Sequence, residues 1–188
     1  VGVLEQFPVK SVALTGQVHP TQIYERLLIG VRDKGINPIR TRTGATIPFD
    51  SAVRLEVLSP DDQFVDSDDT NDASIVIKLT YGQTSFLLTG DAEFPANQAM
   101  LRRGADVRAN VLKLGHHGSS TSTDENWLRA VQPQLGIISA GAGNAFGHPH
   151  REVIDALDRL GVQYIRTDEH GTITVISDGA QLRVTSAR

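Results

Sequence analysis

Three short polar segments of the sequence contain the residue types that bind cations and transfer protons. They are LLTGD, which ends at Asp91, KLGHHGS, which carries His116 and His117, and GNAFGHPH, which carries Asn144 and His148. Each segment follows an apolar, strand-like run, and sites in sheet-and-helix folds form beyond the ends of strands. We therefore expect the carboxylate and the imidazoles to converge in one pocket, although they lie far apart along the chain.

One carboxylate with several imidazoles is a composition suited to a hard or borderline divalent cation. The chain contains no cysteine, so thiolate sites and disulfides are excluded and any metal must be held by His, Asp, Glu or Asn. Zinc and manganese both accept such ligands, and the sequence does not choose between them.

The adjacent histidines lie where a strand passes into a loop. In an extended backbone neighbouring side chains point to opposite faces. We therefore expect one of His116 and His117 to be a ligand and the other to face substrate or to support the site. Gly115 and Gly118 would let the backbone turn sharply. The hydroxyls that follow could donate to phosphate oxygens or cap the next helix.

Other interpretations of these residues do not involve a metal. Asp91 after Thr-Gly could be an ordinary turn residue, and His150 could simply begin a helix. A serine hydrolase using Ser119 or Ser120 would need a nucleophile elbow, and the G-x-S-x-G pattern is absent. The acidic segment 61–72 lacks the spacing of a calcium loop and is interpreted as a solvated loop. None of these interpretations predicts that the polar segments cluster.

The elements that must position these residues can be predicted from periodicity and from turn residues. Helix 123–131 is expected to have Thr123 as its N-cap. Helix 150–161 follows Pro149 and ends at a glycine. The other elements predicted are strands at 9–15, 36–42, 53–58, 110–114, 135–140, 162–167, 172–177 and 181–185, helices at 20–35 and 93–103, and a hairpin over 74–91 that turns at 81–83. Hairpins mixed with strand–helix–strand units indicate a layered α/β domain.

The overall composition is that of a soluble globular protein. The 188 residues are 39% hydrophobic and 21% charged, with a net charge of −4, so a single domain over 1–188 is expected. No global basic field would recruit nucleic acid, and a polyanionic substrate would need local cations or a metal. No apolar run approaches the roughly 20 residues that span a bilayer.

The ordered set GD, GHHGS and NxxGHP, within residues 71 to 179, resembles the C-terminal part of a metallo-β-lactamase-fold hydrolase. It is most similar to the ComEC-type group, the soluble domain of competence DNA-uptake proteins and their free-standing relatives. The resemblance implies an αββα sandwich with a metal-dependent hydrolase site at one edge. It also implies two divalent metal ions, zinc or manganese, and a phosphodiester substrate such as DNA.

The resemblance also implies roles for individual residues. Asp91 is expected to bridge the two metal ions, and His117 is expected to be a ligand, with His116 facing substrate. His148 is expected near the scissile group, with Asn144 supporting it. His116, His148 and Asn144 are thus the expected catalytic residues, and Asp91 and His117 the expected metal ligands.

The sequence departs from the family pattern in one respect. The family's first metal motif, His-x-His-x-Asp-His, does not occur in residues 1–188. The chain is therefore expected to begin just after that motif and to lack the first strands of the sandwich. The family's further metal-binding histidine between that motif and Asp91 has no evident counterpart here, and Asn71 or Asp72 occupies that neighbourhood.

The predicted function is a metal-dependent phosphodiesterase or nuclease domain acting in competence-type DNA uptake, with weak or no metal binding by these residues alone. In competence proteins the domain is attached to membrane spans, so a membrane-attached position on the extracellular or periplasmic face is expected. The alternative is a non-catalytic binding or structural module of the same fold. A His-x-His-x-Asp-His block before Val1 would favour the enzyme.

Overall fold

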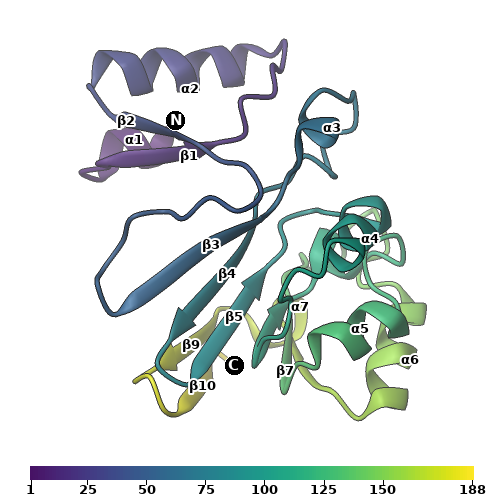
Figure 1. Ribbon diagram of the computed structural model, residues 1–188. Helices are drawn as coiled ribbons and strands as arrows, with labels where there is room; N and C mark the ends of the chain where they lie inside the picture. Colours follow the sequence, from purple (N-terminus) through teal and green to yellow (C-terminus); the bar gives the residue numbers. More distant parts are fainter.

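A six-stranded mixed sheet forms the centre of the protein (Figure 1). The structure is a computed structural model and describes residues 1–188. The sheet has the order β3-β4-β5-β6-β7-β8; β3 to β5 are antiparallel, and β5 to β8 are parallel. Its strands are β3 (Val53–Ser59), β4 (Val76–Tyr81), β5 (Thr84–Leu88), β6 (Val111–Lys113), β7 (Leu135–Ile138) and β8 (Gln163–Arg166). Because β5 to β8 run in one direction, the loops after them leave from the same edge.

Helices cover one face of this sheet. The layer consists of α4 (Phe94–Arg102), α5 (Glu125–Val131) and α6 (Arg151–Leu160) (Figure 1). Leu87 and Leu112 are register partners on the face toward the helices, and both are fully buried in the main core with Trp127 of α5. Leu88, the next residue of β5, points to the opposite face and is 40% exposed. The period of two along the strand explains this difference.

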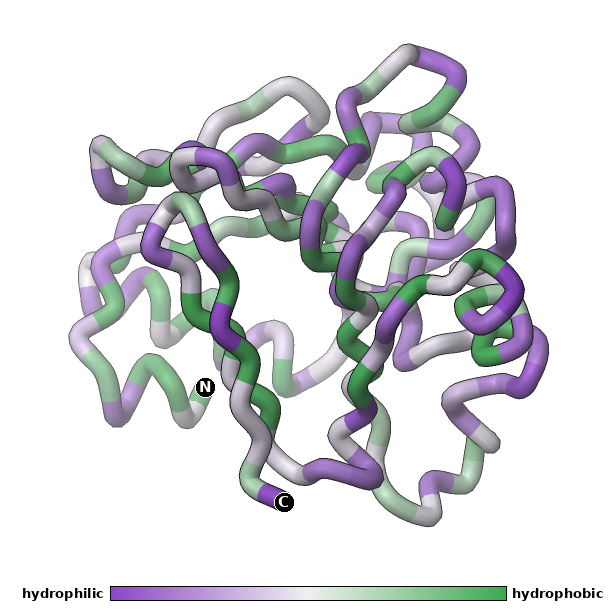
Figure 2. Tube along the Cα trace, turned by 90° about the horizontal axis from the view of Figure 1, so that it is seen from below, coloured by the Kyte–Doolittle hydropathy of each residue, from purple (hydrophilic) through white to green (hydrophobic).

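The N-terminal residues form a smaller unit beside the β3 edge of the sheet (Figure 1). Figure 2 shows the chain from below, coloured by hydropathy, with both termini marked. It contains α1 (Gly2–Gln6), β1 (Ser11–Leu14), α2 (Gln22–Asp33) and β2 (Asn37–Arg40). β1 and β2 are parallel and α2 is their crossover, and Leu4, Val31 and Ile36 form a separate small core. The chain then passes along β3, where Ile47 N donates to Leu55 O at 3.0 Å.

The C-terminal hairpin consists of β9 (Ile173–Ser177) and β10 (Leu182–Ser186). It is joined to the β4–β5 turn, where Gln83 N donates to Gly179 O at 2.6 Å. A Cβ atom on Gly82 would lie 2.3 Å from Gly179 O, so only glycine allows this close approach.

The strands and long helices predicted from periodicity are confirmed, with ends that differ by at most three residues. The predicted N-cap of α5 is wrong: Asp124 accepts from Trp127 N at 2.8 Å, one residue later than Thr123. The segment 61–72 is not wholly a loop, because α3 (Asp62–Val65) forms within it. The short helices α1 and α7 (Thr167–His170) were not predicted, because a single turn carries little periodic signal.

The predicted α/β class is confirmed by the central sheet and its helical layer. The other sheets are the two-stranded pairs β1–β2 and β9–β10. None of the helices combines the length and apolar character needed to cross a bilayer.

Candidate functional site

The loops after β5, β6 and β7 meet at one edge of the sheet, as expected for neighbouring parallel strands. His117 Nε2 lies 3.8 Å from Asp91 Oδ1. The ring centroid of His148 lies 5.3 Å from that of His116 and 6.1 Å from that of His117. The convergence predicted from sequence is therefore present, whereas the individual catalytic and metal-binding roles remain predictions.

The two adjacent histidines lie in a tight 3₁₀ turn, Gly115–Gly118, and not in extended backbone. His116 has φ 44° and ψ 49°, and His117 has φ 59° and ψ 21°. The sequence-based premise of an extended chain at this point is therefore wrong. Left-handed conformations of non-glycine residues are uncommon, cost on the order of 1–3 kcal/mol each, and concentrate at functional sites.

Packing around the turn explains why its glycines are needed. A Cβ atom on Gly118, which has φ +83°, would lie 2.8 Å from Pro149 Cβ. A Cβ atom on Gly115 would lie 3.0 Å from Ala92 O. The β5 and β7 loops thus press on the turn from two sides and hold the histidines between them.

His117 has the hydrogen bonding of a metal-ligating histidine. Its Nδ1 lies 2.7 Å from Ser139 O, so Nδ1–H donates to the carbonyl and Nε2 keeps its lone pair. Nε2 faces the Asp91 carboxylate at 3.8 Å, which is too long for a hydrogen bond. Two tetrahedral ligands of one cation at about 2.0–2.2 Å lie roughly 3.4 Å apart, so the observed separation is slightly wider than that of a bound pair. The His117 imidazole and the Asp91 carboxylate therefore face one another without a hydrogen bond between them.

His116 is held by a different partner. Its Nδ1 lies 2.8 Å from Glu93 Oε1, and the same carboxylate oxygen accepts from Thr121 Oγ1 at 2.8 Å and from Asn71 Nδ2 at 3.3 Å. With Nδ1–H donated to Glu93, the free Nε2 accepts a proton in the neutral ring and donates one in the cationic ring. Sequence reasoning missed Glu93, although it lies only two residues after Asp91.

Asp72 supports this arrangement from behind. It is 3% exposed, and its Oδ1 accepts from Glu93 N at 2.9 Å and from Ala96 N at 3.3 Å, so it caps the start of α4. Burial raises the pKa of the Asp72 carboxyl, and its two backbone donors oppose that shift. The Asp72 carboxylate thus accepts hydrogen bonds from the first backbone N–H groups of α4, and the Asn71 amide donates to the Glu93 carboxylate.

Asn144 fastens the loop that carries His148. Its Oδ1 accepts from Phe146 N at 3.2 Å and from His148 N at 3.0 Å, and its Nδ2 donates to Gly141 O at 2.9 Å and His148 O at 2.6 Å. The hydrogen bonds of the Asn144 amide therefore all lie within the loop, and they fix its backbone. Burial lowers the pKa of His148, and the neighbouring His150, His116 and His117 lower it further, against a smaller opposing effect of Asp91.

Lys113, at the end of β6, is a further group that sequence reasoning missed. Its Nζ donates to Leu114 O at 2.7 Å. Burial lowers the pKa of the Lys113 ammonium, and the Asp91 carboxylate opposes this. The sequence carries a signal for it, because this lysine follows two apolar residues in a short strand and precedes the GHHG turn.

Ser120 and His150 form the one contact at the site between a serine hydroxyl and an imidazole. Ser120 N donates to His150 Nδ1 at 3.0 Å, and Ser120 Oγ lies 2.9 Å from the same atom. His150 Nε2 lies 3.4 Å from Phe146 O and no carboxylate contacts the ring. The pair therefore lacks the third group of a catalytic triad and fastens two loops together.

The cation-binding capacity of residues 1–188 is limited. No group of three or more His, Cys, Asp or Glu side chains is arranged to hold a metal ion. Structural and catalytic zinc sites use at least three protein ligands. Asp91 and His117 thus fit part of a divalent-cation site, and a complete site needs further ligands.

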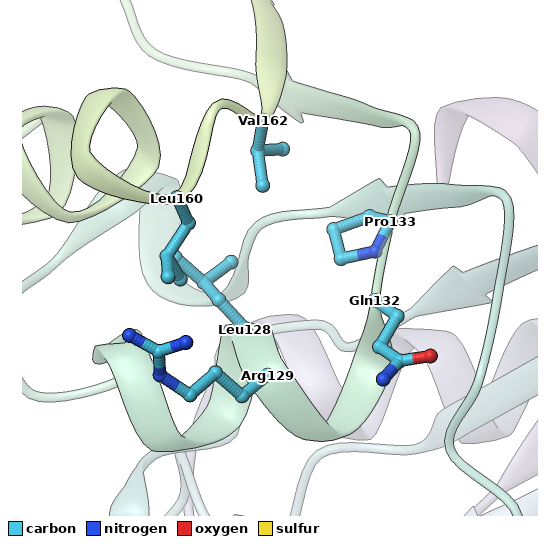
Figure 3. Close-up of a pocket in the computed structure, with 6 residues that line it drawn as sticks. All are labelled: Leu128, Arg129, Gln132, Pro133, Leu160 and Val162. Atoms are coloured by element: carbon cyan, nitrogen blue, oxygen red, sulfur yellow. The ribbon is translucent and has the colours of Figure 1, made fainter.

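Two cavities differ in their relation to this cluster. One of about 200 Å³ lies directly on it and is lined by His117, Ala140, Gly141, Asn144, Phe146 and His148. Another, of about 490 Å³, is formed where Leu128 of α5 faces Leu160, with Pro133 and Val162 nearby (Figure 3). Pro133 and Val162 precede β7 and β8, so this second cavity lies at the amino ends of the strands, opposite the histidines.

Comparison with known proteins relates the chain to competence proteins. No family model matches. The chain is 36% identical over 149 residues to ComE operon protein 3 of Bacillus subtilis, covering 79% of the chain and 19% of that protein. It is 36% identical over 136 residues to Recombination protein 2 of Haemophilus influenzae, covering 72% and 17%, and 34% identical over 106 residues to Competence protein ComA of Neisseria gonorrhoeae, covering 56% and 15%. The chain therefore spans less than a fifth of these relatives.

A solved structure supports the fold. A protein of Parabacteroides distasonis, assigned as a metal-dependent hydrolase, superposes with a TM-score of 0.50 and 14% sequence identity, covering 88% of this chain and 79% of that one. At this identity the likeness establishes the fold and nothing about the reaction. The chain thus has the α/β fold of that neighbour and sequence similarity to one part of the competence proteins.

Proposed function

We propose that this chain is the hydrolytic part of a competence-type DNA-uptake protein and cleaves phosphodiesters, DNA in particular, with the help of divalent metal ions. The observation that carries the proposal is the approach of Asp91 to His117, with His116 and His148 beside them. These relatives supply the competence context, in which the domain would be attached to membrane-spanning segments.

Asp91 and His117 would hold the ions, zinc or manganese, and further ligands would come from sequence before Val1. When bound, two such ions activate water and neutralise the charge of the phosphoryl oxygens. The Ser139 carbonyl fixes the His117 tautomer that leaves Nε2 free for this task. A His-x-His-x-Asp-His segment upstream is the source of ligands that we expect.

His116 and His148 would bind the phosphate group and transfer the proton to the leaving oxygen. Glu93 orients the His116 ring, so that Nε2 can donate a proton to the leaving ester oxygen of the phosphodiester. The lowered pKa of His148 keeps that ring neutral near pH 7, where it can accept a hydrogen bond or a proton. Asn144 would act only by holding His148 in place.

The test compares Asp91→Asn with Asp33→Asn, an exposed carboxylate of α2 paired only with Arg32. Both are made in residues 1–188 and in a longer version that includes the encoded sequence before Val1. Hydrolysis of labelled DNA and bound metal are measured with zinc and with manganese. We expect metal-dependent hydrolysis in the longer version, its loss in Asp91→Asn, and weak binding by residues 1–188. Hydrolysis that survives Asp91→Asn would refute the assignment.

The second candidate is a non-catalytic module, favoured by the absence of a three-ligand group in residues 1–188. It predicts a longer version that folds normally yet binds no stoichiometric metal. Metal analysis of the longer version therefore decides between the two.

A further inference from the structure

Phe146 is a large aromatic residue that is exposed to solvent beside the cluster of His116, His117 and His148. Its side chain is 78% exposed. The ring stacks on His148, with centroids 5.9 Å apart and planes at 19°. Both rings line the cavity of about 200 Å³ that also contains His117. An exposed phenylalanine contributes little to the core, so this position needs another explanation.

Hydrogen bonds hold the backbone of the loop that carries Phe146. Asn144 Oδ1 accepts from the backbone N–H groups of Phe146 and His148 at 3.2 and 3.0 Å. The opposite wall is fixed as well, since Ala140 N donates to Thr167 Oγ1 at 2.9 Å. A loop whose backbone is ordered before binding loses little backbone freedom when a ligand arrives.

The size and chemistry of the cavity indicate what could lie against the ring. A volume of about 200 Å³ is below the roughly 300–1,000 Å³ of pockets that enclose a drug-sized ligand, so it would accommodate one ring system. Ala140 and Gly141 give it an apolar wall, while His117 and Asn144 make its border polar. A flat aromatic platform of this kind binds nucleobases by stacking, with little dependence on sequence.

We propose that Phe146 is the stacking platform for one nucleobase of a single-stranded nucleic acid bound at this edge of the sheet. The identity of the ligand rests on the proposed function, because a phosphodiester near Asp91 and His117 carries its base within reach of the ring. Bases of a duplex are stacked and paired inside the helix, so the platform selects single strands. The net charge of −4 supplies no general attraction for the phosphates, so base stacking has to provide much of the contact.

Fluorescence tests the stacking directly. Phe146→Trp is titrated with a short oligothymidine and with an abasic oligomer of the same length, in EDTA and at low salt. Phe49→Trp is the matched control, because Phe49 is 73% exposed but lies in the segment before β3. The native Trp127 is 2% exposed and contributes the same background to both. We expect the oligothymidine alone to quench the fluorescence of the Phe146→Trp variant in a saturable manner, and neither oligomer to quench that of the control.

Affinity measurements complete the test. Phe146→Ala should weaken binding of the oligothymidine about 5- to 150-fold and leave binding of the abasic oligomer unchanged. Phe146→Tyr should retain the affinity. Equal losses for both oligomers, quenching by both, or no saturable binding of either by the unsubstituted chain would overturn the proposal.

The outcome is separable from that of the proposed function, because the titrations contain no metal and measure no hydrolysis. Stacking without hydrolysis in the longer version would leave a single-strand-binding module. Hydrolysis without stacking would place the base elsewhere.

Discussion

Replacement of Asp72 tests how much its hydrogen bonds to the start of α4 contribute to the stability of the fold. Asp72→Ala removes the acceptor of two backbone N–H groups, those of Glu93 and Ala96, at a position that is 3% exposed. Loss of an N-cap lowers stability by about 0.5–2 kcal/mol, and an unpaired buried donor adds about 1–3 kcal/mol. We therefore expect the free energy of unfolding to fall by about 2–3 kcal/mol.

Asp72→Asn separates the hydrogen bonds from the charge. Asparagine keeps the acceptor oxygen, so the expected change is below about 1 kcal/mol. Burial raises the pKa of Asp72 above its ordinary value of 3.8, so its contribution to stability is fully present below pH 3.8 and is lost as the pH rises through the folded-state pKa. The stability of Asp72→Asn relative to the unsubstituted chain should therefore increase with pH from about 3.8 upward.

The assay is urea unfolding at several pH values, followed by circular dichroism, with Asp68→Ala as the control. Asp68 is exposed and should change the stability by less than about 0.5 kcal/mol. Asp72→Ala as stable as this control, or Asp72→Asn losing relative stability as the pH rises, would refute the reasoning.

Two further predictions concern the turn and its histidine. Gly118→Ala should lower the free energy of unfolding by at least about 2 kcal/mol in thermal or urea unfolding, because its φ of +83° and the approach to Pro149 both disfavour a Cβ atom. Gly141→Ala is the control: nothing lies within 4 Å of its Cβ position, so the free energy of unfolding should change by less than about 1 kcal/mol. Equal effects of the two substitutions would contradict the packing described. Glu93→Ala removes the acceptor of His116 Nδ1–H, so it should remove the Nδ1–H resonance of His116 from proton NMR spectra and reduce hydrolysis by the longer version about 10- to 100-fold. An unchanged resonance would show that Glu93 does not orient the ring.

Local patterns in the sequence were enough for most of the elements. The β4–β5 hairpin was predicted because β-branched and aromatic runs flank a Gly-containing turn, and α6 because Pro149 precedes it and Gly161 follows it. The polar residues after β5, β6 and β7 could be expected to meet, since parallel strands end at one edge. These inferences need only neighbours in the chain and the geometry of a sheet.

Contacts between distant segments decided the rest. The left-handed turn at His116 and His117 depends on Pro149 and on the Ala92 carbonyl, which press on Gly118 and Gly115. Likewise the partners of the two imidazoles, Glu93 and the Ser139 carbonyl, lie 23 and 22 residues away in the chain. No local pattern encodes such pairings, because they form only when separate strands and loops pack together, and that packing assigned each histidine its distinct surroundings.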